Sequence, residues 1–466
     1  FGPLAAQDGL WEVPILFQLP LDGDASNKKW VLVCSMGPSL AQFFVGHFDG
    51  TRFTLDERDE AYLMHGSGLP GDVWEDFEGR TMRRWSARGE AFSGAPFARR
   101  KEFPITGLLG RGLASSGVRS DEALGTMRSA PFTIRRNAIN FLIAGGRQPG
   151  DACINLLVNG EIVRSSTGQE SDRLKWAGWV VADLIGEEAV IEIVDRSPTR
   201  WGHINVDHIM FSDVLINTGR EHANWIDWGP DFYAMRIFRD YDGVMDSTVW
   251  MAWMGSWDYA NDTPTTWGRG VQSIPREISL VSTPRGYAIH QRPWPALRHL
   301  RGPEIEVSSM LIRDAVPVEA FKPARNVYEL EAVFYLDDAG AQQVGLNLCT
   351  GGGDVVAIGY DALSKNVFLD RRKSGNVGFS ERFPRRVSAP FFEPGGEIKF
   401  NVFVDQSSVE VFVNDGRMVL TSQIYPDPGN RGVELFSYRG DVILRSLSAW
   451  ELASIWEKPP TGKEEP

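Results

Sequence analysis

The feature that most constrains the fold is the alternation of apolar and polar residues over short segments in the last third of the chain. Within residues 327–336, one face of the predicted strand carries Tyr328, Leu330, Ala332, Phe334 and Leu336. Residues 400–404 and 409–413 alternate in the same way. A period of two is typical of half-buried β-strands, and several such strands predict a sandwich of two packed sheets.

Short strands and turns also dominate the rest of the chain. Strand-like runs occur at 29–36, 138–144, 153–158, 189–194 and 249–254, and residues 1–60 as a whole read as strands. Asn159-Gly160 lies between two such runs and predicts a β-hairpin with a type I′ turn. The chain has 48 Gly and 27 Pro, and long amphipathic helical patterns are few. We therefore expect an all-β protein that is rich in turns.

At 466 residues the chain is longer than one ordinary domain. Its composition changes at the Gly-rich segment 66–71, near 214 and again near 306. The expected domain segments are therefore 1–70, 71–213, 214–305 and 306–457, and the pattern of the first resumes in the third. The polar, Pro-rich residues 458–466 predict a disordered tail.

Charge and cysteine content narrow the classes of partner. The chain has 61 acidic and 48 basic residues, a net charge of −13, which argues against a nucleic acid or an anionic membrane as the partner. No apolar run approaches the roughly 18 residues that a membrane span requires. A neutral glycan fits better, although acidity can serve solubility alone. Cys34, Cys153 and Cys349 lie far apart without a CxxC or a histidine cluster, so no zinc site is expected.

Two segments place carboxylates beside aromatic rings and next to a Gly or Pro turn. One contains Trp11 and Glu12, and the other, residues 227–234, contains Asp231 and Tyr233. Carboxylates bind hydroxyl groups and transfer protons, while flat rings pack against the apolar face of a sugar. The pattern predicts a sugar-binding pocket whose parts are far apart in the sequence.

Several motifs, in order, resemble glycoside hydrolase family 32, the β-fructofuranosidases, which include invertases, inulinases and levanases. The motifs are Trp11-Glu12-x-Pro14-x-x-Phe17, Asp227-x-Gly229-x-Asp231-Phe232-Tyr233-Ala234, Trp257-x-Tyr259-Ala260, Ser273-Ile274-Pro275-Arg276-Glu277, Phe368-Leu369-Asp370-Arg371, residues 404–412 and Tyr425-Pro426. The resemblance covers about 1–65 and 217–455. It implies a partial five-bladed β-propeller followed by a C-terminal β-sandwich, with the active site in the funnel at the propeller axis.

Residues 71–213 resemble a fructan-binding carbohydrate-binding module of family 66. The segments that carry this resemblance are 139–143, 153–157 and 201–207. A β-sandwich module inserted into the propeller would explain why two parts of one site are separated in the sequence. Within it, His203 and Asp207 are candidate ligand-binding residues, or else a structural histidine and carboxylate with satisfied hydrogen bonds.

A structural calcium ion is a further possibility in the inserted module. Asp76, Glu78 and Asp207 are its candidate ligands, because jelly-roll modules often join their first and last strands through such an ion. We expect no cofactor to be required for the chemistry of the propeller site.

The resemblance assigns roles to the candidate site residues. Glu12 falls at the acid/base position of a retaining glycosidase that acts on the β-fructosidic bonds of levan, inulin or sucrose. Asp231, Tyr233 and Trp257 match positions that line the pocket, and Trp11 is a further candidate for sugar contact. The residues themselves leave other roles open: Glu12 as a solvated or structural carboxylate, Asp231 as a buried hydrogen-bond acceptor, and the aromatics as core.

The sequence also departs from the family pattern. Val13 and Ile15 stand where Cys and Asp are usual, the nucleophile motif Trp-x-Asn-Asp-Pro-x-Gly is absent, and residues 239–241 lack the proline of a fructose-binding Arg-Asp-Pro motif. Because the sequence starts at Phe1, we expect a further N-terminal segment, or a separate chain, that carries the nucleophile and the first blades. The alternative function is a non-catalytic fructan-binding protein. The resemblance favours an extracellular or periplasmic location.

Overall fold

The computed structural model describes residues 5–7, 9–93, 95, 97–98, 104–118, 120, 122–238, 247–266, 268–337, 340–392 and 394–456. The predicted tail at 458–466 and the incomplete motif at 239–241 lie outside these residues. The described residues form an almost entirely β structure, which confirms the predicted all-β class. No helix in the described ranges is long and apolar enough to cross a membrane.

The first sheet combines strands from both sides of segment 71–213, and we call it the propeller portion. One antiparallel meander contains β1 (Trp11–Leu21), β2 (Asp24–Met36), β3 (Leu40–Phe48) and β4 (Phe53–Leu55). The other contains β17 (Tyr233–Phe238), β18 (Thr248–Met254), β20 (Arg276–Thr283) and β21 (Gly286–Pro293), and β19 (Val271–Gln272) pairs with β18. Four-stranded units of this kind are the blades of β-propellers. The two meanders meet where β1 and β20 pair at Leu21 and Leu280.

Helix α1 (Glu57–His65) follows β4, where the sequence had predicted strands up to residue 60. The Asp56 side chain accepts a hydrogen bond from the Arg58 N–H at its start, and Gly66, with φ 66°, ends it through bonds to helix carbonyls. Acidic residues in its first turn favour the positive end of the helix dipole. Caps rather than an apolar stripe define this helix, so hydrophobic periodicity could not reveal it.

Strands β5 to β16 pair with one another in two six-stranded sheets, which we call the inserted unit. One sheet contains β6 (Trp85–Gly89), β9 (Gly125–Ser129), β10 (Phe132–Thr133), β12 (Ala152–Val158), β13 (Glu161–Ser166) and β15 (Glu188–Asp195). The other contains β5 (Asp72–Glu75), β7 (Phe97–Ala98), β8 (Gly112–Ser115), β11 (Ala138–Gly145), β14 (Ser171–Val180) and β16 (Ile204–Ser212), and η1 (Ala182–Leu184) connects β14 to β15. Asn159 and Gly160 have φ of 53° and 83°, as the predicted type I′ hairpin requires.

The last two sheets form the predicted C-terminal sandwich. One contains β22 (Ile305–Val307), β23 (Met310–Ile312), β25 (Val327–Tyr335), β30 (Glu397–Asp405), β31 (Ser408–Val413), β32 (Met418–Gln423) and β34 (Val442–Glu451). The other contains β24 (Ala315–Pro317), β26 (Gln343–Gly351), β27 (Asp354–Asp361), β28 (Asn366–Lys373), β29 (Arg386–Pro390) and β33 (Gly432–Tyr438). Tyr328, Leu330, Ala332 and Phe334 are all fully buried between the sheets, which confirms the alternation in this segment.

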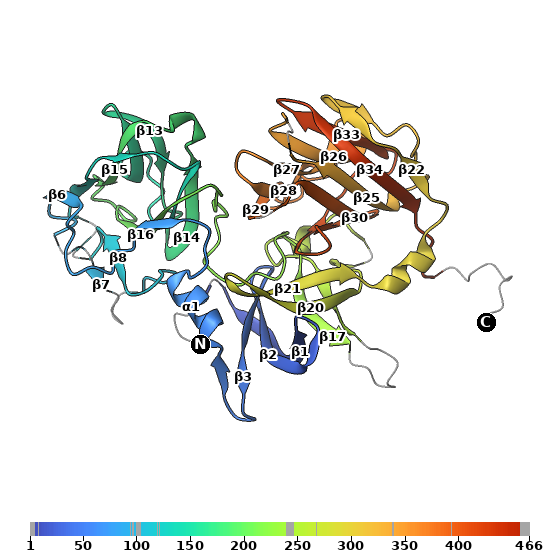
Figure 1. The fold of residues 1–466 in the computed structure, drawn as a ribbon, viewed down its shortest axis with the longest axis horizontal. Coiled ribbons are helices and arrows are strands. Elements are labelled where there is room, and N and C mark those ends of the chain that lie inside the picture. Colours follow the sequence, from blue (N-terminus) through green and yellow to red (C-terminus); the bar gives the residue numbers. More distant parts are fainter. Residues whose placement is uncertain are drawn as a thin grey trace.

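The propeller portion lies between the other two units (Figure 1). The inserted unit stands beside α1, and the C-terminal sandwich stands over β20 and β21 (Figure 1). The short helix η3 (Pro295–Leu300) carries the chain from β21 into the sandwich, while η2 (Ala260–Asp262) lies between β18 and β19. The chain between β16 and β17, residues 213–232, therefore runs past all three units.

Candidate active site

Glu12 and Tyr233, which are far apart in the sequence, meet at the first strands of the two meanders. The Tyr233 hydroxyl donates a hydrogen bond to Glu12 Oε2 over 2.6 Å. Glu12 is half-buried, whereas Tyr233 is only 2% exposed. Burial, together with the hydrogen bond to Glu12, raises the pKa of Tyr233 far above its usual value, so the phenol keeps its proton and remains a donor. The structure thus brings these two predicted site residues together.

A bulge follows each of the two residues. The β1–β2 register shifts between Glu12 and Ile15, and the β17–β18 register shifts between Tyr233 and Arg236. The residue after each site residue, Val13 or Ala234, has a positive φ of 52° or 54°. Such a backbone is costly for a β-branched valine, and bulges next to active sites re-aim side chains. Backbone strain in β1 and β17 thus coincides with the Glu12–Tyr233 contact.

A buried serine supports the second bulge. Ser35 on β2 lies opposite Glu12 in the β1–β2 ladder, and its Oγ accepts a hydrogen bond from the Ala234 N–H over 3.0 Å. Ser35 is fully buried. The one side chain therefore connects the strand next to Glu12 with the backbone that follows Tyr233. The sequence showed only a serine in an apolar strand, a weak signal.

Aromatic side chains extend the site away from Glu12. Trp253 on β18 pairs with Tyr233 in the ladder, and their rings are 6.2 Å apart. The Trp257 ring lies 5.1 Å from that of Trp253 and is 59% exposed. Trp11 instead packs against a core cluster, with its ring 6.2 Å from Phe44. Trp257 therefore presents an exposed ring, and Trp253, which the sequence analysis did not single out, packs against it.

Asp231 has a different environment from the predicted one. It is fully buried. One oxygen accepts hydrogen bonds from Arg371 over 2.5 Å and from the Gln423 N–H over 2.8 Å, and the other accepts the Tyr259 hydroxyl. With both oxygens occupied and no solvent contact, the carboxylate fits the alternative that the sequence left open, a buried structural acceptor, rather than a sugar ligand. Its partners Arg371 and Gln423 belong to the C-terminal sandwich.

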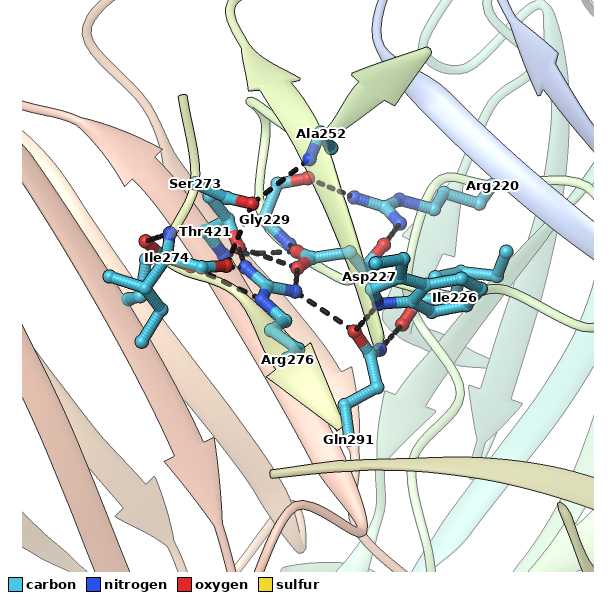
Figure 2. A network of polar contacts seen from close by, with 12 residues as sticks. Arg220, Ile226, Asp227, Gly229, Ala252, Ser273, Ile274, Arg276, Gln291 and Thr421 are labelled. Carbon is cyan, nitrogen blue, oxygen red and sulfur yellow. Dashed lines mark hydrogen bonds and ion pairs between the residues drawn. The ribbon is translucent and has the colours of Figure 1, made fainter. Parts of the chain in front are cut away.

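Asp227, four residues earlier, is also directed to the sandwich (Figure 2). Its Oδ2 pairs with Arg276 over 3.0 Å and accepts the Thr421 hydroxyl over 2.6 Å. Arg276 is fully buried and also pairs with Glu410 over 2.5 Å, and it donates to Gln291 over 3.0 Å. Figure 2 shows Arg276 between Asp227 and Gln291. Asp227, Asp231 and Arg276 of the family motifs therefore help to build the junction between propeller and sandwich. Within segment 227–234, Tyr233 is the residue that contacts Glu12.

The candidate residues of the inserted unit make local contacts. His203 Nε2 lies 2.8 Å from Asp172 Oδ1, and both side chains are partly exposed. Asp207 is fully buried and accepts hydrogen bonds from the N–H groups of Leu109 and His208 over 2.8 and 2.7 Å. Burial raises the pKa of Asp207 well above its usual value. His203 keeps a small exposed fraction, 12% of its side chain, whereas Asp207 has the structural environment that the sequence analysis weighed as its alternative.

The predicted calcium ligands accept hydrogen bonds from backbone N–H groups. Glu78 Oε1 accepts the N–H groups of Arg111 and Gly112 over 2.6 Å each, and Asp76 Oδ1 accepts the Glu78 N–H over 3.1 Å. Backbone donors thus occupy one oxygen of Glu78 and one of Asp76. Across the described part of the chain, no group of three or more His, Cys, Asp or Glu side chains is placed to hold a metal ion.

Two protein-family models match the chain. The model of the glycosyl hydrolases family 32 N-terminal domain matches residues 191–293, and that of the family 32 C terminal matches residues 296–451. The chain belongs to glycoside hydrolase family 32. The family matches include β17 to β21 and nearly the whole sandwich, and hence both networks around Asp227 and Asp231.

Relatives of known name agree with this family 32 membership. A protein of Aspergillus rugulosus named as the glycosyl hydrolase ecdE is 35% identical over 98% of this chain and 66% of its own length. The levanase of Bacillus subtilis is 35% identical over 51% of this chain and 35% of its own length. The chain therefore spans just under two thirds of the first relative and about a third of the second.

A solved structure shares the fold. The exo-inulinase of Aspergillus awamori superposes with a TM-score of 0.56 at 21% identity, over 98% of this chain and 59% of that one. At this identity the likeness concerns the fold alone. It supports the same arrangement of a β-propeller and a β-sandwich for this family 32 chain.

Proposed function

We propose that this chain is part of an enzyme that hydrolyses β-fructosidic bonds of fructans, with Glu12 as its acid/base. The observation that carries the proposal is the 2.6 Å hydrogen bond from the Tyr233 hydroxyl to Glu12, beside the exposed ring of Trp257. A carboxyl group next to an open aromatic face can protonate the oxygen of a bound sugar's leaving group. The Tyr233 phenol would hold the carboxylate in place and support its negative charge after proton transfer.

The proposed mechanism is retaining hydrolysis. A second carboxylate, about 5–5.5 Å from the acid, attacks the anomeric carbon while Glu12 protonates the leaving oxygen. Glu12 then removes a proton from the water that releases fructose. The nucleophile motif of the family does not occur in residues 1–466, so the proposal places the nucleophile, together with the remaining blades, on a segment outside these residues.

Fructan polymers are the proposed substrates, ahead of sucrose. Among the relatives are a levanase and an extracellular exo-inulinase, names that also favour an extracellular location here. We propose that the inserted unit binds fructan, with His203 as a candidate contact. A tethered binding unit raises the effective concentration of an enzyme on a polymer. The absence of the nucleophile motif instead favours the second candidate, a fructan-binding protein without hydrolytic activity.

Fructose release from levan by the full-length protein tests this function. Glu12→Gln keeps the size of the side chain but removes its acid, and we expect about 10²- to 10⁴-fold slower release. Glu60→Gln, on the exposed face of α1, is the matched control and should retain full activity. Equal activity of Glu12→Gln and wild type would refute the role of Glu12. Levan binding without any fructose release by wild type would support the non-catalytic alternative.

A further inference from the structure

A cavity of about 540 Å³ lies between the propeller portion, the segment that precedes β17 and the C-terminal sandwich. Its walls come mainly from segments 223–228, 281–291, 390–392 and 416–419. Neither Glu12 nor the aromatic residues around it contribute to this lining, so the cavity is separate from the candidate active site. Its size lies within the range of pockets that bind small molecules, about 300–1,000 Å³.

Aromatic rings supply much of the wall. Trp225 and Trp228 come from the segment that precedes β17, Tyr62 from α1, and Phe391 and Phe392 from the edge of the sandwich. Both tryptophans are only partly buried, so part of each ring remains accessible. Flat rings from different units that face one cavity favour a ligand with a flat apolar body.

The polar part of the lining carries positive charge. Arg285 lies over the Phe392 ring at 4.3 Å, and Arg417 lies over the Phe391 ring at 5.5 Å. His290 also lines the cavity. No aspartate or glutamate occurs among the described residues of the lining. The described part of the lining thus contains two arginines and no carboxylate, in a chain with 61 acidic residues and a net charge of −13.

A third arginine lies behind the tryptophans. The Arg220 guanidinium is 5.6 Å from the Trp225 ring and 5.2 Å from the Trp228 ring. It donates hydrogen bonds to the backbone carbonyls of Asp227, Trp228 and Gly229, and Figure 2 shows it directed toward this segment. Carbonyl oxygens satisfy its donors but do not cancel a full charge. The wall that Trp225 and Trp228 form is therefore backed by a partly buried cation.

We propose that this cavity binds a small organic anion with a flat apolar body, such as an aromatic carboxylate. The anion would lie near Arg285 and Arg417, and its ring against Trp225 and Trp228. The two arginines favour an anion over a neutral ligand, because a guanidinium binds a carboxylate through charge-assisted hydrogen bonds. The proposal does not depend on the hydrolytic function, because it uses no residue of the Glu12 site.

Binding of two probes that differ only in charge tests the proposal. We would measure the affinities of 2-naphthoate and of neutral 2-naphthalenemethanol for the full-length protein by isothermal titration calorimetry. The wild type should bind the carboxylate at least about tenfold more tightly, the gain expected from one charge-assisted hydrogen bond. Arg285→Gln and Arg417→Gln, tested separately, should bring this ratio close to one. Arg445→Gln, which removes a surface partner of Glu397, should leave the ratio unchanged.

The ratio of the two affinities distinguishes a loss of charge recognition from a loss of folding, because a misfolded variant loses binding of both probes. Retained binding of the alcohol with lost preference for the carboxylate in either arginine variant supports the proposal. Equal affinity of the two probes for the wild type overturns it. Displacement of 2-naphthoate by saturating levanbiose would also overturn it, since the cavity would then be a sugar site.

Discussion

The propeller portion forms two junctions with its neighbours, and their chemistry is opposite. The sandwich junction contains two buried ion-pair clusters, Asp227–Arg276–Glu410 and Asp231–Arg371. The module junction, between α1 and the inserted unit, contains aromatic rings and uncharged imidazoles instead. The comparison indicates that buried ion pairs fix the geometry of the sandwich junction. The stability of the module junction should instead depend on pH, because its imidazoles can take up protons.

His222 is the centre of the module junction. The Trp176 indole N–H, which can only donate, lies 3.3 Å from His222 Nδ1, and His222 Nε2 lies 2.9 Å from the Tyr62 carbonyl oxygen. Nδ1 must therefore accept and Nε2 must donate, which requires a neutral ring. The Tyr62 and His222 rings are 4.5 Å apart, and His208 packs edge-on to Trp176 at 6.0 Å.

The largest effect is expected for Arg276→Met at the sandwich junction. The change would leave Asp227 and Glu410 buried without their cation, and the loss of one partner of a buried ion pair costs about 3–5 kcal/mol. Denaturant unfolding of the protein measures the change in free energy. Arg445→Met, which removes an exposed ion pair with Glu397, is the control and should cost no more than about 1 kcal/mol. Similar losses of unfolding free energy in both variants would mean that burial does not increase the contribution of the Arg276 ion pairs to stability.

The second cluster permits a double-mutant cycle, with a smaller expected effect. Arg371→Met alone should destabilise the protein by about 3 kcal/mol, because Asp231 loses its cation in a fully buried position. Arg371→Met combined with Asp231→Leu should recover most of this loss, since no unpaired charge remains buried. Additive losses in the double variant would show that the two residues act independently and would contradict the proposed coupling.

The two junctions also show how far sequence reasoning extends. The sequence predicted the alternating strands and the Asn159-Gly160 hairpin because both depend on neighbouring residues. It placed Glu12 and Tyr233 in one site through the motif resemblance, and the structure brings them into contact. The direction of Asp231 was not predictable, since its partner Arg371 is 140 residues away and a strand motif does not reveal which carboxylate faces a neighbouring domain.

Acidic pH should weaken the module junction and leave the sandwich junction in place. Burial lowers the pKa of both His222 and His208 from 6.5 to about 4; nearby Arg285 acts in the same direction on His222, whereas Asp76 opposes it on His208. A histidine with a lowered pKa in the folded state contributes stability above pH 6.5, and this contribution is lost as the pH falls toward 4. Hydrogen exchange of residues 217–223 should therefore accelerate between pH 6.5 and 4, after correction for the intrinsic pH dependence.

His222→Gln is the matched variant for this pH effect. Glutamine can accept from the Trp176 indole and donate to the Tyr62 carbonyl without a change of charge, so the variant should show a weaker pH dependence at the module junction. Strand β25 of the sandwich provides an internal control and should show no such change. If the pH dependence of hydrogen exchange were unchanged in His222→Gln, titratable groups other than His222 would be its cause.

The smallest effect is expected within the propeller portion, where one neutral hydrogen bond joins the two meanders beside Glu12. Ser35→Ala would leave the Ala234 N–H without the Ser35 hydroxyl that accepts it over 3.0 Å, at a cost of about 1–3 kcal/mol for an unsatisfied buried donor. Because Ala234 follows Tyr233, the full-length enzyme should also lose activity, by less than about tenfold, through the hydrogen bond to Glu12. Denaturant unfolding and fructose release from levan measure the two effects. Ser93→Ala, which removes an exposed hydroxyl that donates to the Glu90 carbonyl, should change neither by a measurable amount. A loss of stability with unchanged activity would show that the bulge after Tyr233 does not position the carboxyl group of Glu12.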